Sequence, residues 1–413
     1  MKNDAAEQQT GGSEGRPRYQ NHVAVAIVLV VAGIAVALGQ YKVPSVMPAL
    51  METFGMDMAS TSMLMSVFTF VGIVLALPAG FLARRIGAKN LMVIAVAVLV
   101  VGTVVGAFAT SGTMLVASRA IEGVGLVTCG VCAPLVIRGY SAPTRVGFVT
   151  GIWALWISLG SFFGGVLTPS LFGVVGFQGT WLVMAAIAAA AGAMLLLYLK
   201  TPEGGIFESV AKRALQDAAV PRARVRDLFT RDLLLILGGF LMFNMVLISM
   251  LTYSPTFLQG EGMDPTLSGF ASTLPMLLAV VTSPLFGVLA DKTGRIKLLQ
   301  VVSMLAMGPC ACVLLTTASP ALWVAAVVMG LVGLGAPTMF LITYPLSVSR
   351  VELMPIAMGL LVMVQSLGQF LGALVAPMVL AGGWMALGLF VMVLGLVGTG
   401  LLALARMKPA PAA

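Results

Sequence analysis

Two stretches of this sequence follow one pattern: GFLARRIGAKN at residues 80–90 and GVLADKTGRIK at residues 287–297. Each places a Gly, a Leu and an Ala before a polar turn that contains a second Gly and ends in basic residues. The second stretch follows the first after 207 residues, counted from Gly80 to Gly287. One charge is reversed between them, since Arg84 in the first corresponds to Asp291 in the second. The pattern indicates an internal repeat.

A second pair of stretches repeats at nearly the same offset. LGSFFGGVLTP at 159–169 corresponds to LGQFLGALVAP at 367–377, which begins 208 residues later. Two independent matches at one offset predict two homologous halves that are joined by a polar, charged linker. The predicted division of the chain is a disordered cytoplasmic tail over 1–21, a six-helix bundle over 22–199, a cytoplasmic linker over 200–231, a second six-helix bundle over 232–405 and a tail over 406–413.

The composition places both halves in a membrane. The chain is 59% hydrophobic and 9% charged, whereas a soluble domain averages about 25% charged residues. Runs of about 20 apolar residues recur along the whole chain, each long enough to cross a hydrocarbon core about 30 Å thick. The sequence therefore predicts an all-α integral membrane protein with twelve transmembrane helices in two pseudo-symmetric bundles. The predicted spans are 22–50, 59–83, 90–110, 113–137, 146–169, 177–199, 232–258, 266–290, 296–318, 321–346, 354–380 and 384–405.

The basic residues predict the orientation. If the N-terminus is cytoplasmic, every Lys and Arg outside the spans falls on the cytoplasmic side, as expected from the excess of Lys and Arg in cytoplasmic loops. If Lys297, at the second position of span 296–318, is counted with the loop before it, two of the 23 basic residues, Lys42 and Arg119, are left within the spans. We therefore expect a multi-pass protein of a bacterial inner membrane with both termini in the cytoplasm. The net charge of +8 reflects this asymmetry and gives no indication of nucleic-acid binding.

The repeated stretch resembles the loop signature between the second and third helices of the major facilitator superfamily, Gly-x-Leu-Ala-Asp-basic-x-Gly-basic-basic. The second copy matches it at Gly287, Leu289, Ala290, Asp291, Lys292, Gly294 and Arg295. The first copy matches at Gly80, Leu82, Ala83, Arg85, Gly87 and Lys89, with Arg84 in place of the acid. A helix-4 signature of the family, Arg-x-x-polar-Gly-x-Gly, is similar to Arg119, Glu122, Gly123 and Gly125. The resemblance implies the fold of these secondary transporters, alternating access between two halves, and no enzymatic activity or cofactor.

The fifth predicted helix is only partly similar to the antiporter signature Gly-Pro-x-x-Gly-Gly. Gly160, Ser161, Gly164 and Gly165 are present, but the proline is missing. Glycines at this spacing also allow close packing of membrane helices, and we interpret them in that way. Drug antiport is therefore the second hypothesis, not the first.

The intramembrane charges are the main functional candidates. A charge at the centre of a span costs about 2.5–3.5 kcal/mol on insertion scales, so it requires a partner or a task. Glu122 is the acid inside a predicted span, and it lies three residues after Arg119, so the two side chains can meet on one helix face. This pair is either a neutralised structural pair or a coupling site, in which a proton on Glu122 frees Arg119 for an anion. The resemblance implies a coupling or conformational role for this arginine.

Lys42 has two open interpretations. It lies toward the end of the first predicted helix and could extend outward to the interface. Pro44 and Pro48 follow it, however, and prolines free backbone carbonyls toward a cavity. Its position resembles that of the first-helix lysine that contacts carboxylate in the monocarboxylate transporters of the same superfamily. Gln40 and Lys42 are about 200° apart on an ideal helix, so both cannot face one cavity without a distortion.

Two intramembrane cations and one acid favour an anionic solute. The first hypothesis is transport of a small organic anion, a carboxylate, with protons as a possible second substrate, by a monomer in the lipid bilayer. The alternative is efflux of amphipathic drugs or metabolites, and neither hypothesis requires a metal or a nucleic acid. Cys129, Cys132, Cys310 and Cys312 are interpreted as small apolar residues. Further candidates for contact with the solute are Gln40, Tyr41, Trp153, Trp156, Asn244, Tyr344, Gln365 and Gln369.

The reversed charge of the repeat predicts a cytoplasmic gate. In the resembled family, the loop acid of one half meets the start of a helix in the other half. Applying the repeat offset pairs Arg84 with Glu352 and Asp291 with Arg145, so both pairs join opposite charges. Glu352 would offset the repulsion between Arg84 and a helix N-terminus. The alternative is that these are solvated loop charges, whose pairs contribute only about 0–1 kcal/mol.

Overall fold

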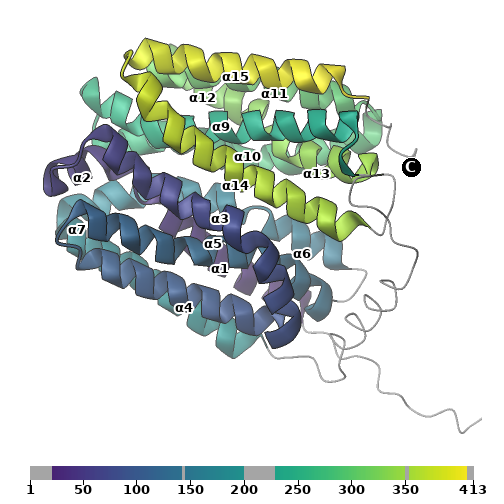
Figure 1. Ribbon diagram of the computed structural model, residues 1–413, viewed down its shortest axis with the longest axis horizontal. Helices are drawn as coiled ribbons and strands as arrows, with labels where there is room; N and C mark the ends of the chain where they lie inside the picture. The colour runs from purple at the N-terminus through teal and green to yellow at the C-terminus, as the bar shows by residue number, and fades with distance from the viewer. Residues whose placement is uncertain (1–20, 142–144, 200–227, 349–352, 407–413) are drawn as a thin grey trace, which may run out of the picture.

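The structure is a computed structural model that describes residues 21–141, 145–199, 228–348 and 353–406, and these residues are nearly all helical (Figure 1). The first half holds α1 (His22–Tyr41), η1 (Pro44–Val46), α2 (Met47–Phe54), α3 (Met58–Ile86), α4 (Ala88–Ala107), α5 (Gly112–Tyr140), α6 (Val146–Trp153) and α7 (Trp156–Tyr198). The second half holds α9 (Arg231–Gly260), α10 (Pro265–Thr293), α11 (Ile296–Thr316), α12 (Ala321–Leu331), η4 (Gly333–Gly335), α13 (Ala336–Ser347), α14 (Met354–Leu380) and α15 (Trp384–Leu404). The predicted tails and most of the linker lie outside the described residues.

The described residues contain eleven segments long and apolar enough to cross a membrane, against twelve predicted spans. The difference lies in one segment of 50 residues, Val149–Tyr198, which includes two predicted spans. At about 1.5 Å per residue it is more than twice as long as a hydrocarbon core is thick. It bends at Gly176, whose φ of 67° is a conformation that glycine adopts without a steric penalty. The all-helical membrane fold is confirmed.

Three predicted spans are broken where one continuous helix was expected. Span 22–50 ends its α-helix at Tyr41 and continues as a 3-10 turn from Pro44, which has no N–H to donate. Span 321–346 changes to a 3-10 turn over Gly333–Gly335, since glycine disfavours a continuous helix. Span 146–169 divides between α6 and α7, where Leu155 donates to Ile152 three residues back at 3.1 Å.

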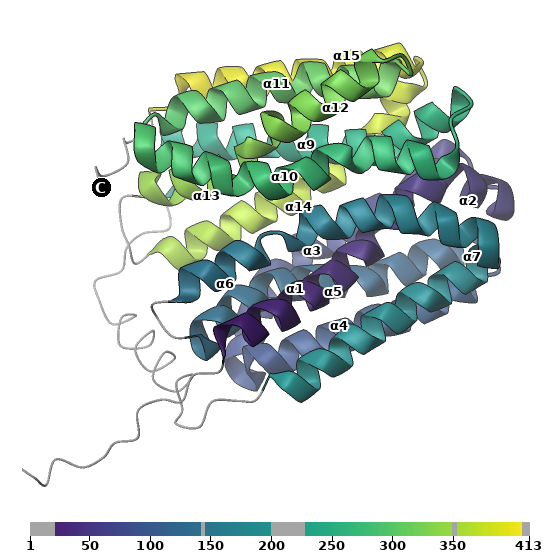
Figure 2. The same cartoon turned by 180° about the vertical axis from the view of Figure 1, so that it is seen from behind.

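The helices pack in two groups that follow the two halves of the chain. In the first half, α1 packs on α7, and α4 and α3 pack on α5. In the second half, α11 packs on α15, and α9 packs on α14 and α15. The two halves meet along two lines of contact, α3 with α14 and α7 with α10. Figures 1 and 2 show these two lines from opposite sides of the molecule.

The two ends of the bundle are named here the proximal end, where α1 begins and α15 ends, and the distal end, which holds α2. Toward the distal end, the halves are in close contact. The hydroxyl groups of Ser62 and Tyr253 lie 2.5 Å apart, and Gln259 Nε2 donates to the Ser45 carbonyl oxygen at 2.9 Å. The rings of Phe162 and Phe270 lie 5.9 Å apart and belong to opposite halves.

Two glycines allow α7 and α10 to touch. A Cβ atom added to Gly165 would lie 2.9 Å from the Gly269 carbonyl oxygen, and one added to Gly269 would overlap the Gly165 carbonyl oxygen. The backbones are therefore in direct contact, which agrees with the packing interpretation of the Gly164–Gly165 pair. Near the proximal end, a Cβ atom added to Gly80 or Gly287 would meet nothing within 4 Å. The contacts of Ser62, Gln259 and Gly269 thus join the halves toward the distal end.

Candidate functional site

Lys42 forms a buried ion pair with Glu122. It caps the end of α1, and its backbone N–H donates to the Leu38 carbonyl oxygen at 2.9 Å. Its Nζ atom lies 2.9 Å from Glu122 Oε1, and both side chains are 0% exposed. The outward orientation considered for Lys42 is therefore wrong in this structure. Although 80 residues separate them in sequence, α1 and α5 bring the two groups together.

Arg119 pairs with the other oxygen of the same carboxylate, as the three-residue spacing on α5 predicts. Its remaining donors reach backbone carbonyl groups on two other helices. Nε donates to the Leu64 oxygen at 3.0 Å, and the two terminal nitrogens donate to the oxygens of Gly39 at 2.7 Å and of Gln40 at 3.3 Å. The guanidinium also lies 4.2 Å from the ring centre of Phe68. Arg119 thus joins α5 to both α1 and α3.

When all three groups are ionised, the Lys42–Glu122–Arg119 cluster carries one net positive charge inside the first half. Two cations share one carboxylate, and all three side chains are fully buried. Lys42 Nζ lies 3.5 Å from the Thr103 hydroxyl on α4 and 4.9 Å from the ring centre of Trp181 on α7. These neighbours are uncharged. A charge buried in uncharged surroundings costs free energy unless an opposite charge pairs with it, so such a charge indicates a functional role.

Glycines on α4 make room for the cluster. A Cβ atom added to Gly102 would lie 2.8 Å from Glu122 Cγ, so any larger residue would push the carboxylate away from its partners. A Cβ atom added to Gly106 would lie 3.1 Å from the Trp181 ring. The sequence therefore provides a close crossing of α4 with α5 at the level of the cluster.

The cluster lies next to a contact between the halves. The backbone oxygen of Gln40 accepts from Arg119, and the Gln40 side chain donates to Gln369 Oε1 of α14 at 3.2 Å. Gln40 and Lys42 therefore point in different directions, as their predicted separation of about 200° requires. Gln40 crosses to the second half, while Lys42 points into the first.

The other predicted contact residues are dispersed. Tyr41 is buried where α1 packs on Gly164 of α7. Trp153 and Trp156 stack on one another with ring centres 5.0 Å apart, and they pack on α1 at Gly33. Within the described part of the chain, none of these three side chains forms a hydrogen bond or an ion pair with the charged cluster.

Three further candidates lie in the second half. Asn244 Nδ2 donates to the Phe240 oxygen of its own helix at 2.8 Å. Gln365 is half-buried on α14. Tyr344 is fully buried near the proximal end of α13, and its hydroxyl has no hydrogen-bond partner among the described residues.

The predicted gate is described only in part. Glu352 and the side chain of Arg84 lie outside the described residues. Asp291 and Arg145 are both exposed, and the ion pairs of the described residues do not include one between them. In a molecule closed at the distal end, the proximal gate would be open, so the gate stays a prediction.

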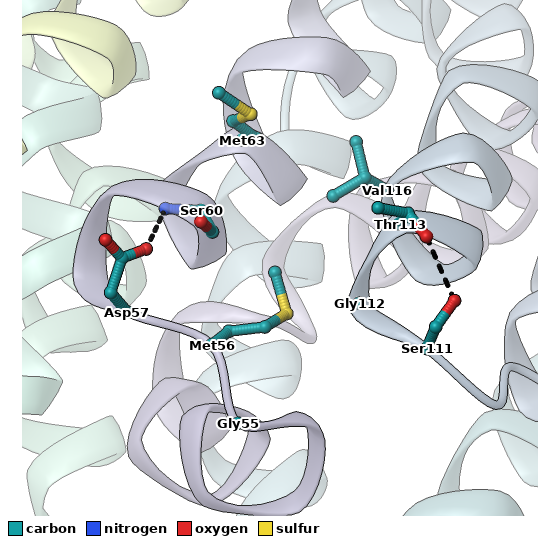
Figure 3. Close-up of a pocket in the computed structure, with 9 residues that line it drawn as sticks. All are labelled: Gly55, Met56, Asp57, Ser60, Met63, Ser111, Gly112, Thr113 and Val116. Atoms are coloured by element: carbon teal, nitrogen blue, oxygen red, sulfur yellow. Dashed lines mark hydrogen bonds between the residues drawn. The ribbon is translucent and has the colours of Figure 1, made fainter.

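A pocket of about 520 Å³ opens at the distal end between the starts of α3 and α5 (Figure 3). Met56, Met63 and Val116 give it an apolar wall. Its charged lining residue, Asp57, caps α3 by accepting from the Ser60 backbone N–H at 2.8 Å. Hydrogen bonds from the Ser60 side chain and backbone hold the pKa of Asp57 below its usual range. No predicted site residue lines this pocket.

Sequence reasoning missed the residues that complete the cluster. Thr103 and Trp181 are an ordinary threonine and tryptophan within apolar spans, and only the fold brings them to Lys42. Ser62 and Tyr253, which meet across the halves, were also not singled out. Cys129 and Cys132 are buried, as expected of small apolar residues, and no group of metal-binding residues occurs among those described.

Comparison with known proteins identifies the family. The Major Facilitator Superfamily profile matches residues 29–373, and a second match covers residues 262–413. The chain belongs to the major facilitator superfamily. A solved structure of a D-xylose-proton symporter from this comparison has a TM-score of 0.74 at 16% identity, over 94% of this chain and 98% of that one. This likeness confirms the transporter fold, and members of the superfamily are transporters and not enzymes.

Two relatives are named for different functions. The chain is 29% identical to the Methylenomycin A resistance protein of Bacillus subtilis over 198 residues, 46% of this chain and 40% of the relative. It is 25% identical to a protein of Cupriavidus necator named Probable sulfoacetate transporter, over 274 residues and 61% of either chain. The match therefore spans less than two thirds of either relative. The match to the profile establishes the superfamily.

Proposed function

We propose that this superfamily member carries a small organic anion, of the carboxylate class, across a bacterial inner membrane by alternating access, with proton coupling. The observation that carries the proposal is the Lys42–Glu122–Arg119 cluster. It combines full burial, one excess positive charge and a direct link to the contact between the halves through Gln40. An interior of low dielectric constant strengthens the attraction of such a charge for an anion.

The conformation supports a solute path from the proximal end. The halves touch at the distal end through Ser62 and Tyr253 and through Gly165 and Gly269. With both termini in the cytoplasm, as the positive-inside rule predicts, we propose that this distal contact closes the periplasmic side. The predicted gate pairs would then form in the opposite state.

The two relatives support different solutes. The Cupriavidus necator protein is named for an organic anion, sulfoacetate, in agreement with the anion proposal. The Bacillus subtilis protein is named for resistance to methylenomycin A, and this favours efflux as the second candidate. The net positive charge of the cluster favours the anion over a cationic drug.

A transport panel tests the function. The protein is reconstituted in proteoliposomes and offered carboxylates, sulfonates, inorganic anions, neutral compounds and cationic compounds, with and without a pH gradient. We expect saturable uptake of at least one carboxylate or sulfonate that a pH gradient increases. Transport restricted to neutral or cationic compounds would support the efflux candidate and contradict the anion proposal.

Removal of either cation is expected to weaken transport of the anion. Arg119→Ala should reduce binding and uptake at least roughly 10-fold, because it removes the excess positive charge that would attract the anion. Lys42→Ala should have a smaller effect, and Lys42→Arg should retain more binding than Lys42→Ala. Cys129→Ala, a buried change on α5 outside the cluster, is the control. Normal uptake by both alanine variants, at normal membrane levels, would contradict the assignment.

The gate hypothesis predicts rescue by a second charge reversal. Arg84→Glu should slow cycling several-fold, because it would place two acids opposite each other when the proximal end closes. Adding Glu352→Arg should restore the attraction and most of the transport rate. Initial rates of uptake measure the effect, and Arg85→Glu, next to the proposed pair, is the control. A double variant no faster than Arg84→Glu would remove the gate hypothesis.

A further inference from the structure

The charges of the cluster do not balance. Lys42, Arg119 and Glu122 together carry one positive charge when all are ionised. The elements packed around Lys42 supply no further described charge within contact of Nζ. α5 supplies Glu122 and Arg119, α4 supplies the Thr103 hydroxyl, and α7 supplies the Trp181 ring. The excess charge is therefore held within the first half, unless one group releases its proton or an anion joins the cluster.

Glu122 is poorly placed to gain a proton. Each of its oxygens accepts from a different cation, Oε1 from Lys42 and Oε2 from Arg119. A neutral Glu122 would leave two cations side by side without a counter-charge, and an uncompensated buried charge costs several kcal/mol. Arg119 keeps its proton at all working pH values, and three backbone oxygens also bind it. Lys42 is the remaining group that can change its charge.

We propose that Lys42, rather than Glu122, releases and takes up the coupled proton; this inference rests on the proposed proton-coupled function. The ammonium of Lys42 loses one proton to water, which leaves a neutral amine and a cluster with a net charge of zero. Uptake of one proton restores the charge of +1. A monovalent anion is then attracted to the protonated cluster only, so one proton and one anion move together without net charge.

The position of Lys42 links this charge to the contact between the halves. Lys42 ends α1 and is followed directly by the break that leads into η1. The Ser45 oxygen of η1 accepts from Gln259 of the second half at 2.9 Å. A change in the attraction between Glu122 and Lys42 therefore acts three residues away from Ser45, which accepts a hydrogen bond across the distal contact. This makes Lys42 a residue that both binds the proton and positions η1.

Trp181 provides a direct measurement, because its ring centre lies 4.9 Å from Lys42 Nζ. A variant with Phe at positions 153, 156, 323 and 384 keeps Trp181 as its single tryptophan. We expect its fluorescence to titrate with pH, because an ammonium and an amine perturb the indole differently. The titration should vanish with Lys42→Met and with Lys42→Arg, and should persist, displaced along the pH axis, with Glu122→Gln. A titration that survives Lys42→Met and vanishes with Glu122→Gln would overturn the proposal.

Transport by the full chain gives an independent test that does not need the tryptophan variant. Lys42→Arg keeps the positive charge and cannot release it, so stimulation of uptake by a pH gradient should fall at least tenfold. Exchange of anion for anion should be reduced but measurable. Lys89→Arg, at a half-buried lysine near the proximal end, is the matched control. Full stimulation by the gradient in Lys42→Arg would overturn the Lys42 proposal and leave the proton-coupled function standing. A wild-type protein without stimulation would contradict the coupled function itself.

Discussion

Gly269→Val should abolish transport, with a loss of at least roughly 100-fold. The side chain would be forced onto the Gly165 backbone, because even a Cβ atom at this position overlaps the Gly165 carbonyl oxygen. Overpacking costs about 1–3 kcal/mol where side chains can shift, and a backbone oxygen can shift less. The distal ends of α7 and α10 therefore could not close. Initial rates of uptake in proteoliposomes measure the loss.

The same variant should expose the distal contact. Ser62 is buried opposite Tyr253, so a cysteine at position 62 should react slowly with a membrane-impermeant thiol reagent. In the Gly269→Val background this reaction should be at least tenfold faster. Gly173→Ala is the matched control on α7, since a Cβ atom there meets nothing within 4 Å. Normal transport by Gly269→Val, or unchanged labelling, would show that the glycine contact does not limit closure.

The sequence predicted the membrane fold because its signals are local and strong. Apolar runs of about 20 residues need no tertiary information, and the repeat at 80–90 and 287–297 gives the two halves directly. The helix breaks were less predictable. Pro44 was noted as a distortion, but the division between α6 and α7 at Ala154 and Leu155 has no proline or glycine to mark it. That break depends on how α6 and α7 pack on α1.

The site was predictable only where sequence spacing determines contact. The pairing of Arg119 with Glu122 follows from one helical turn, and the structure contains it. The pairing of Lys42 with Glu122 depends on how α1 crosses α5, which no spacing along the chain specifies. The angle of about 200° between Gln40 and Lys42 on an ideal helix predicts that they point in different directions. It does not predict which of them reaches the second half. Tertiary packing decides that Gln40 does.

This arrangement changes how the anion proposal should be understood. Lys42 and Arg119 are not two free cations waiting in a cavity, since both already bind Glu122. What the cluster offers to a solute is the excess of one charge, together with the backbone bonds that Arg119 makes to α1 and α3. The binding of an anionic solute would therefore depend on the total charge of the cluster more than on a hydrogen bond from one side chain. The protonation state of Lys42 would set that total.

Glu122→Gln is the variant with the largest expected effect on stability. The substitution keeps the size of the side chain and removes the counter-charge of two buried cations, and loss of one partner from a buried ion pair costs about 3–5 kcal/mol. The loss should grow as the pH falls. In the folded variant, repulsion by Arg119 favours the neutral amine form of Lys42. In the unfolded chain, the lysine is far from Arg119 and stays protonated. The unfolded state then binds more protons, so stability rises with pH.

Melting temperatures of the detergent-purified protein across a pH series test this expectation. Glu52→Gln, at an exposed acid of α2, is the matched control and should show no such slope. Lys42→Met combined with Glu122→Gln leaves Arg119 as the single cation, still bound to its three backbone oxygens. We expect the double variant to melt at a higher temperature than Glu122→Gln and to lose the added pH dependence, because the group that titrates has gone. Two results would contradict this expectation: a loss of stability in Glu122→Gln that is equal at every pH, or a double variant that is less stable than Glu122→Gln. Either would mean that Lys42 stays charged beside Arg119 and that the two cations do not require Glu122 as their counter-charge.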